Sequence, residues 1–321
     1  MTRIATLLIC CAAAMTHPVY AQTALAEIEI EAAGPQGLLK GSMLRVPGAT
    51  APAVLIIPGS GPTDRDGNNP MGLKAATYRM LAEALAAEGI TSVRIDKRGM
   101  FGSAAAIPDA NAVTIADYVA DTATWVAAIR EQTRAPCVWL IGHSEGGLVA
   151  LAAAQQGQDL CGVVLVASLG RSMGDTIKSQ LRANPANAPL IAPADAAIDS
   201  LAAGERVDLA TLPAPLHPLF NPAVQGFLIS AFALDPAQLA ANTDLPILIV
   251  QGDQDLQVSV ADAERIKTAQ PAATLTVLPG VNHVLKTVDS NNPAANIAAY
   301  GNPDLPLSDG VAATIADFIK R

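Results

Sequence analysis

A Gly-x-Ser-x-Gly pentapeptide at residues 142–146 is the segment of this sequence with the clearest capacity for chemistry. An apolar run precedes it and a helix-spaced run follows it, so Ser144 is predicted to lie on a tight turn between a strand and a helix. Side chains two residues before and two after the serine would collide on such a turn, and glycine avoids that clash. The pattern predicts a nucleophilic hydroxyl at Ser144; a glycine-rich turn with an inert serine is the alternative.

A serine hydroxyl needs a base to remove its proton, and this chain has only 4 histidines. His143 is adjacent to the serine and is expected to pack beneath the turn, whereas His217 lies among prolines. His283 follows the last expected strand, at the carboxyl end of the sheet, where open α/β sheets bind ligands. We therefore predict that His283 is the base.

The imidazole in turn needs a carboxylate that orients it and stabilises its charge. When the order along the chain is serine, acid, histidine, the acid follows a strand between residues 144 and 283. Asp253 and Asp255 both follow the apolar run 245–252. We predict that Asp255 is the acid, because it leaves the turn in a position to reach back, and that Asp253 braces the turn.

An acyl-transfer reaction also needs donors for the oxyanion of its tetrahedral intermediate. The backbone N–H of Glu145, directly after the nucleophile, is one expected donor. The loop at residues 58–62 should provide the second, and Ser60 N–H is favoured over Gly61 N–H. Pro62 has no N–H to donate.

Two charged segments follow neighbouring strands, at residues 63–68 and 94–99. The first is expected to be a self-paired structural turn, with shaping of a pocket mouth as the alternative. The second is expected to form structural ion pairs rather than to take part in catalysis. No His, Cys, Asp or Glu cluster has metal-ligand spacing, and no glycine-rich loop matches a nucleotide cradle, so neither metal nor cofactor is expected.

Alternating apolar and helix-spaced segments predict the scaffold that must position these side chains. Strands are expected at residues 27–31, 38–46, 53–57, 91–95, 137–141, 160–167, 245–251 and 274–278. Helices are expected at residues 75–88, 115–129, 146–156, 260–270 and 311–319. The first two strands are typical of an antiparallel edge, and the alternation after them requires a parallel sheet with helices on both faces. The predicted fold class is α/β, with a mostly parallel central sheet.

Residues 170–243 interrupt this alternation, after the sixth expected strand. The segment is rich in alanine and proline, and its prolines are expected to break any long element. Short helices are expected at residues 175–182, 223–234 and 236–241. An insertion between two strands of one sheet indicates a helical lid rather than a second domain.

The N-terminal residues are typical of a secretory signal peptide. Arg3 precedes an apolar run at residues 4–15, and small residues end at Ala21, where cleavage is expected. We therefore expect a signal peptide at residues 1–21, one α/β domain at residues 22–321, and a periplasmic or secreted protein.

Composition excludes several classes of partner. The formal charge of −9 and the lack of any basic run argue against nucleic acid, and 3% aromatic residues are too few for base-stacking platforms. Apolar residues make up 51% of the chain, but the runs after residue 21 are strand-sized, so no stable membrane insertion is expected. Cys137 and Cys161 begin two apolar runs that could be neighbouring strands. The sequence allows either a disulfide between these two residues or two free buried cysteines.

Several motifs together resemble one known family. They are Pro-Gly-Ser-Gly-Pro-Thr-Asp-Arg-Asp-Gly-Asn at residues 58–68, Asp-Lys-Arg-Gly at 96–99, Gly-His-Ser-Glu-Gly at 142–146, Gln-Gly-Asp-Gln-Asp at 251–255 and Asn-His at 282–283. With them the chain resembles bacterial α/β-hydrolases of the carboxylesterase and serine aminopeptidase-like branch. The resemblance implies an α/β-hydrolase fold, esterase activity on short acyl esters, no cofactor, and a triad of Ser144, Asp255 and His283. We therefore expect a small-molecule ester to be cleaved through an acyl-enzyme.

Other activities are kept as alternatives. An aminopeptidase or amidase acting on short peptides would need carboxylates to hold the substrate ammonium. The carboxylates of the insertion are more simply explained as residues on solvated helix faces. They are Asp195, Asp199, Glu205 and Asp208. A thioesterase and a non-catalytic binding protein on the same scaffold are the further alternatives.

Overall fold

The computed structural model describes residues 26–48, 51–157, 159–289 and 292–321, so the expected signal peptide lies outside the described residues. The strands are β1 Glu27–Ala33, β2 Leu38–Leu44, β3 Ala53–Ile57, β4 Thr91–Ile95, β5 Val138–His143, β6 Leu160–Val166, β7 Ile247–Gly252 and β8 Thr274–Leu278. The α-helices are α1 Thr77–Ala87, α2 Ile115–Thr133, α3 Glu145–Ala154, α4 Met173–Ala183, α5 Ala188–Ala202, α6 Gln225–Phe232, α7 Pro236–Ala241, α8 Val260–Ala269, α9 Pro293–Ala299 and α10 Val311–Ile319. The 3₁₀-helices are η1 Phe101–Ala106, η2 Pro185–Asn187, η3 Leu209–Thr211 and η4 Ala214–Leu216.

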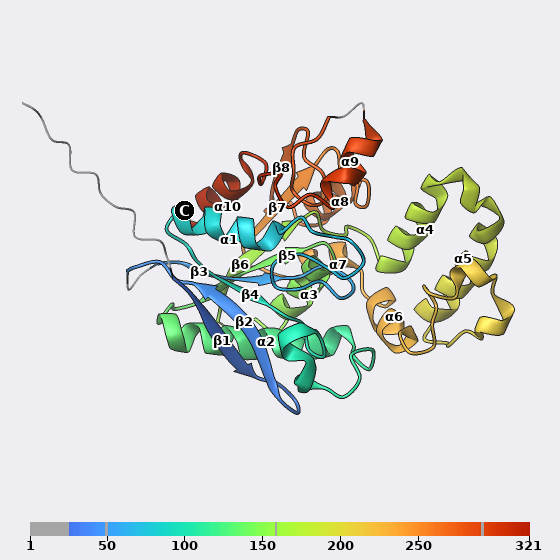
Figure 1. The fold of residues 1–321 in the computed structure, drawn as a ribbon, viewed down its shortest axis with the longest axis horizontal. Helices are drawn as coiled ribbons and strands as arrows, with labels where there is room; N and C mark the ends of the chain where they lie inside the picture. The colour runs from blue at the N-terminus through green and yellow to red at the C-terminus, as the bar shows by residue number, and fades with distance from the viewer. Residues whose placement is uncertain (1–25, 49–50, 158, 290–291) are drawn as a thin grey trace, which may run out of the picture.

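The strands form one sheet in the order β1-β2-β4-β3-β5-β6-β7-β8 (Figure 1). The pairs β1–β2 and β2–β4 are antiparallel, and every pair from β4 to β8 is parallel. The predicted fold class is therefore confirmed: a mostly parallel sheet flanked by helices. The antiparallel edge expected from the first two strands is present as β1 and β2.

The central strand β3 packs on both faces, which explains its unbroken apolar sequence. Along β3, Val54 and Ile56 point to the side covered by α1 and α10, where they join one apolar cluster. Leu55 and Ile57 point to the opposite side and join the larger cluster formed with α2 and α3. Successive side chains of a strand alternate between faces, so both sets of β3 side chains are apolar. This packing fixes the parallel strands in register and aligns their carboxyl ends.

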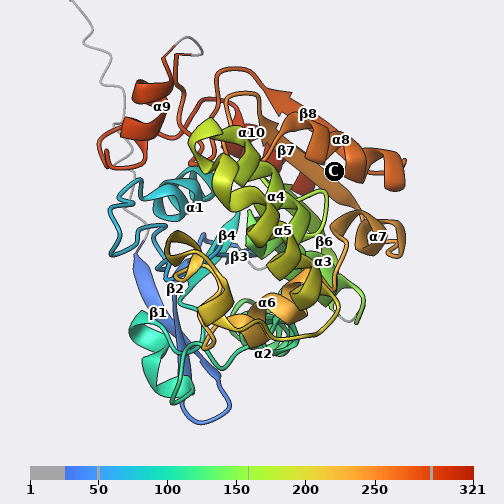
Figure 2. The same ribbon diagram turned by 90° about the vertical axis from the view of Figure 1, so that its right-hand side faces the viewer.

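The chain between β6 and β7 forms a group of helices, α4 to α7, of which α4 to α6 stand to one side of the sheet (Figure 1). Seen at right angles, α4 and α5 lie in front of the sheet and run close to each other (Figure 2). The expectation that prolines prevent any long element here is wrong, because α5 has 15 residues and contains Pro193. Pro189 lies in its first turn, where the missing N–H costs nothing. Pro193 removes one helical hydrogen bond, and burial of one apolar face, including Ile198 and Leu201, stabilises the helix in spite of this loss.

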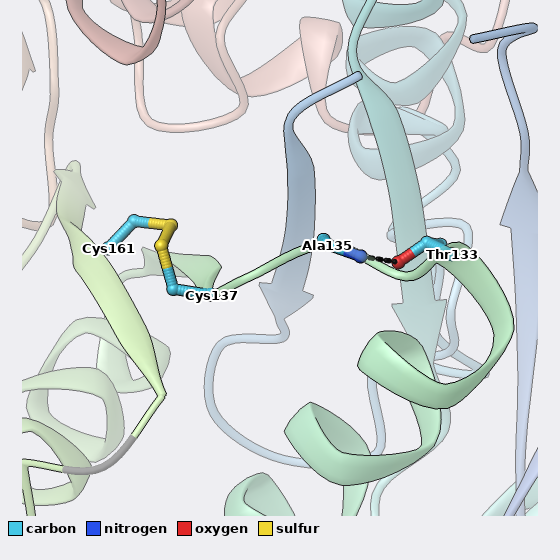
Figure 3. The surroundings of a disulfide bond; sticks show 4 residues. All are labelled: Thr133, Ala135, Cys137 and Cys161. Atoms are coloured by element: carbon cyan, nitrogen blue, oxygen red, sulfur yellow. Dashed lines mark hydrogen bonds between the residues drawn. A yellow bond between two sulfur atoms is a disulfide. The ribbon is translucent and has the colours of Figure 1, made fainter. Parts of the chain in front are cut away.

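Cys137 and Cys161 are joined by a disulfide at the amino-terminal ends of β5 and β6, with their Cα atoms 5.2 Å apart (Figure 3). The strand register shifts here: Val138 pairs with Leu160, but Trp139 pairs with Gly162. Cys161 is therefore the extra residue of a β-bulge. The disulfide lies at the end of the sheet opposite the carboxyl ends of the strands.

Within the described ranges, no helix is long and apolar enough to cross a membrane.

Candidate active site

Ser144 lies on the turn between β5 and α3, as its flanking sequence predicts. Its backbone has φ 55° and ψ −121°, a strained conformation for a residue with a side chain. A methyl group built at Gly142 would lie 2.3 Å from the Gly146 carbonyl oxygen, and one built at Gly146 would lie 2.3 Å from the Ile57 oxygen. Only glycine fits at either position. The two glycines therefore permit a turn that exposes the serine hydroxyl.

Asp255 and His283 form a hydrogen-bonded pair on the loops after β7 and β8. Nδ1 of His283 lies 2.8 Å from Oδ2 of Asp255, and the two side chains are 6% and 1% exposed. The other oxygen of Asp255 accepts from the N–H groups of Gln257 and Val258 at 2.7 and 2.9 Å. These bonds fix the carboxylate, so the imidazole keeps its proton on Nδ1 and leaves Nε2 as the acceptor.

Opposing effects act on the acid of this pair. Burial by itself would raise the pKa of Asp255, but the charge of His283 and the hydrogen bonds from His283, Val258 and Gln257 outweigh burial. The net result is a lowered pKa, so Asp255 is ionised at neutral pH. The structure thus distinguishes the two aspartates of the loop: Asp253 accepts from the Gly280 N–H at 2.7 Å and braces the turn.

His143 connects the serine turn to the histidine loop. Its Nε2 donates to the backbone oxygen of His283 at 2.8 Å, because a carbonyl can only accept. Nδ1 of the neutral ring is then an acceptor, and the Tyr78 hydroxyl donates to it at 2.9 Å. The Tyr78 oxygen itself accepts from the Gly59 N–H at 2.9 Å. A single chain of hydrogen bonds therefore links the loop after β3 to the backbone of His283.

Burial and then the charge of His283 lower the pKa of His143 to about 3, so this ring is neutral at pH 7. Burial raises the pKa of Tyr78, so its phenol keeps the proton that it donates. The rings of His143 and His283 are 4.8 Å apart between centroids. Ser144, the residue after His143, thus lies beside the His283 loop, although its hydroxyl makes no hydrogen bond to His283 among the described contacts. Such a contact is often long before substrate binds.

The two expected oxyanion donors lie on segments that meet at the serine turn. Gly59 packs over the turn, since a methyl group built on it would lie 3.3 Å from Ser144 Cβ. Ser60 follows it, and Glu145 begins α3. In the part of the chain that the structure describes, neither the Ser60 N–H nor the Glu145 N–H donates to a protein acceptor. Both groups are therefore available to a ligand at the turn.

Lys97, just after β4, makes contacts that the sequence did not reveal. Its Nζ donates to the Gly59 oxygen at 2.8 Å and lies 3.4 Å from Oε1 of Glu145. The neighbouring charges form ion pairs of the expected structural kind: Arg65 with Asp96, Arg94 with Asp66, and Arg98 with Asp117 and Asp121. The segment at residues 63–68 is a turn in which Asp64 accepts from the N–H groups of Asp66 and Asn68. The expected self-pairing of its charges is wrong, because Arg65 and Asp66 pair with the second charged segment, at Asp96 and Arg94.

A cavity of about 470 Å³ lies beside Glu145 and the loop after β3. Its walls are mostly apolar and include Met100, Phe101, Val113 and Phe227. Phe227 belongs to α6, so the insertion contributes one wall. His217, also in the insertion, instead bonds to the Leu212 oxygen at 2.9 Å. Within the described ranges, no group of three or more His, Cys, Asp or Glu residues could hold a metal ion.

Residues 71–287 match the protein family described as serine aminopeptidase, S33. Esterase EstD of Thermotoga maritima is 23% identical over 268 residues, which are 81% of this chain. The chain spans 61% of the length of that esterase.

Two solved structures are similar over most of their length. The esterase Pf2001 of Pyrococcus furiosus has a TM-score of 0.55 and 16% identity, and the match covers 92% of this chain and 93% of that one. Est1E of Butyrivibrio proteoclasticus has a TM-score of 0.54 and 15% identity, covering 92% and 99%. At these identities the likeness shows that the fold is shared.

Proposed function

The chain belongs to the serine aminopeptidase S33 family and is a hydrolase of the α/β-hydrolase fold, and from that premise we propose that it is a serine esterase. Ser144 is the nucleophile, His283 the base and Asp255 the acid. The observation that carries this proposal is the Asp255–His283 hydrogen bond at 2.8 Å beside a serine held at φ 55°. The substrate is a small-molecule ester with an apolar group.

In the first half of the reaction, Nε2 of His283 takes the proton of the Ser144 hydroxyl as its oxygen attacks the ester carbonyl. The N–H groups of Ser60 and Glu145 stabilise the oxyanion that forms. His283 then gives its proton to the leaving alcohol, and an acyl group stays on Ser144. In the second half, His283 activates a water molecule that hydrolyses the acyl-enzyme. Asp255 stabilises the imidazolium in both halves.

The apolar cavity favours an ester over a peptide substrate. An aminopeptidase must bind the ammonium of its substrate with carboxylates. Among the described residues that line the cavity, Glu145 is the one carboxylate, and Lys97 already pairs with it. In the insertion, Asp195 pairs with Arg182 and Asp199 pairs with Lys178, away from the cavity lining. Among the residues that the structure describes, no unpaired carboxylate lines the cavity to attract an ammonium group.

Parallel assays of two substrate types test the proposal. We expect p-nitrophenyl butyrate to be hydrolysed and leucine p-nitroanilide to be hydrolysed at least about 100-fold more slowly in kcat/KM, a difference of about 2.7 kcal/mol in transition-state binding. Faster hydrolysis of the anilide would contradict the ester assignment and favour the peptidase alternative. A wild-type protein that hydrolyses neither substrate and does not react with a fluorophosphonate would contradict the enzyme mechanism.

We further propose that the protein is exported to the periplasm or secreted. The disulfide between Cys137 and Cys161 supports export, because such bonds persist in oxidising compartments. Fractionation of cells that produce the full chain tests this, with recovery in the cytoplasmic fraction as the contrary result.

A further inference from the structure

Lys97 is a buried lysine placed between the two segments that carry the proposed oxyanion donors. Its side chain is 5% exposed, and that of its partner Glu145 is 3% exposed. The ammonium donates to the Gly59 oxygen at 2.8 Å, lies 3.4 Å from Glu145 Oε1 and lies 5.4 Å from the centre of the Tyr118 ring. Burying an amino group requires such partners, because isolated buried charge is costly. Two of these partners belong to the loop after β3 and to the start of α3.

The contact with Gly59 fixes the direction of the Ser60 N–H. The Gly59 carbonyl and the Ser60 N–H belong to one planar trans peptide unit, so they point in opposite directions. When Lys97 holds the carbonyl on one side, the N–H of Ser60 must point to the other. The peptide unit before it is held as well, because the Gly59 N–H donates to Tyr78 at 2.9 Å. Hydrogen bonds therefore hold both peptide units of Gly59: Tyr78 holds the preceding one, and Lys97 holds the one that carries the Ser60 N–H.

The contact between Lys97 and Glu145 holds the residue that carries the second oxyanion donor, the Glu145 N–H. Glu145 is the first residue of α3, and its own N–H is the donor that follows the nucleophile. A side-chain contact from Lys97 at 3.4 Å holds this residue against the loop after β3. One ammonium group therefore contacts both residues whose relative position sets the spacing of the two N–H groups.

We propose that Lys97 is a positioning residue that holds the Ser60 and Glu145 N–H groups in the geometry that an oxyanion requires. This inference rests on the serine esterase function proposed above. Oxyanion donors must be in place before the charge develops, and their contribution falls steeply when they are displaced. An ion pair that only stabilised the fold would lower the free energies of the free enzyme, the substrate complex and the transition state equally. Lys97 instead stabilises the transition state more than it stabilises the free enzyme or the substrate complex.

The test compares double variants, which remove both charges of the pair, with a reference that keeps Lys97; in the reference the ammonium retains the Gly59 oxygen and a side-chain amide oxygen at position 145 as acceptors. Lys97→Met alone would leave Glu145 buried without a cation, and this could unfold the chain. The informative pair is therefore Glu145→Gln as the reference and Lys97→Met with Glu145→Gln as the test, since both keep the backbone N–H of residue 145. A second test protein, Lys97→Met with Glu145→Met, replaces the ion pair by an apolar pair, which is often tolerated without loss of stability. Thermal unfolding of each variant establishes that it is folded.

The readouts are kcat and KM for p-nitrophenyl butyrate, and the inhibition constant of a trifluoromethyl ketone, which adds to the serine and forms an oxyanion. Relative to Glu145→Gln, we expect both test proteins to lose about 10- to 100-fold in kcat, with KM changed less than about threefold. The inhibition constant should rise by the same factor as kcat falls, because the ketone adduct needs the same donors. Equal kcat and equal inhibition constants in reference and test proteins would overturn the inference.

The two proposals fail in different ways. If the wild type hydrolyses no ester and Ser144 is not labelled by a fluorophosphonate, the esterase function itself is wrong. If the wild type is an active, Ser144-dependent esterase but the Lys97 variants match their reference, only the role of Lys97 is wrong. A rise in KM with unchanged kcat would also overturn it, since that result indicates a contact with the substrate in its ground state.

Discussion

Tyr78→Phe removes one hydroxyl group and two hydrogen bonds, and its effect can be estimated from the structure. Tyr78 is 3% exposed, accepts from the Gly59 N–H and donates to His143 Nδ1, each at 2.9 Å. Both of its partners are buried and would be left unpaired, at a cost of about 1–3 kcal/mol for each. The expected loss in the free energy of unfolding is therefore about 2–6 kcal/mol. For a chain of about 300 residues this lowers Tm by about 3–10 °C.

The substitution should also lower activity. Without the phenol, no donor holds the proton of His143 on Nε2, so its bond to the His283 carbonyl is weakened. We expect kcat for p-nitrophenyl butyrate to fall about tenfold, which corresponds to about 1.4 kcal/mol. Circular dichroism on heating gives Tm, and initial rates at saturating ester give kcat.

Tyr118→Phe is the matched control for stability. Tyr118 is also buried, but its hydroxyl makes no hydrogen bond within the described part of the chain. Its removal should change the free energy of unfolding by less than about 0.5 kcal/mol, since no partner is left unpaired. If Tyr78→Phe melts at the same temperature as Tyr118→Phe and keeps the wild-type kcat, the hydrogen-bond chain through His143 has no energetic importance.

Three further predictions concern the acid, the disulfide and pH. Asp255→Asn should lower kcat about 10⁴-fold, because an amide cannot stabilise the imidazolium, whereas Asp253→Asn should change it less than tenfold; a dead Asp253→Asn beside an active Asp255→Asn would reverse the assignment. Cys137→Ser with Cys161→Ser, which opens a loop with a sequence separation of 24, should cost about 3.5 kcal/mol and leave kcat unchanged; equal Tm values with and without the bond would contradict this. The pKa of His143 is lowered to about 3 in the folded state, below the unfolded value of about 6.5, so protonation favours unfolding and the stability from this group is lost as pH falls below about 6.5. Between pH 7 and pH 5, urea unfolding should show the wild type losing about 2 kcal/mol more than His143→Gln, and parallel pH profiles would refute the neutral buried ring.

Strand β3 could be predicted because its burial on both faces leaves an unbroken apolar run in the sequence, whereas β4 carries Ser92 and Arg94 and β8 is only partly buried. The expected bounds 53–57, 91–95 and 274–278 are those of β3, β4 and β8. The insertion was predicted less well, because α5 depends on tertiary packing that offsets Pro193. Local propensity alone favours a break at such a residue.

The candidate site also contains residues that the sequence predicted and residues that it did not. Ser144, Asp255 and His283 follow strand ends. The alternation of strands and helices along the chain therefore predicted that they lie at one edge of the sheet. The roles of Tyr78 and Lys97 could not be predicted. Tyr78 falls on the apolar stripe of α1, where its ring packs like any other, and only the structure reveals that its hydroxyl reaches His143. Lys97 lies in a charged run, and sequence alone does not distinguish the residue among its neighbours that contacts Gly59.

The most direct test of the central claim is to locate a covalent adduct. The wild-type protein is incubated with a fluorophosphonate, digested, and analysed by tandem mass spectrometry beside Ser144→Ala and His283→Ala. We expect one adduct, on Ser144, which is absent from Ser144→Ala and forms far more slowly in His283→Ala, with ester turnover lowered about 10⁴-fold or more in both variants. An adduct on another residue, or a Ser144→Ala protein that still hydrolyses esters at the wild-type rate, would contradict the account.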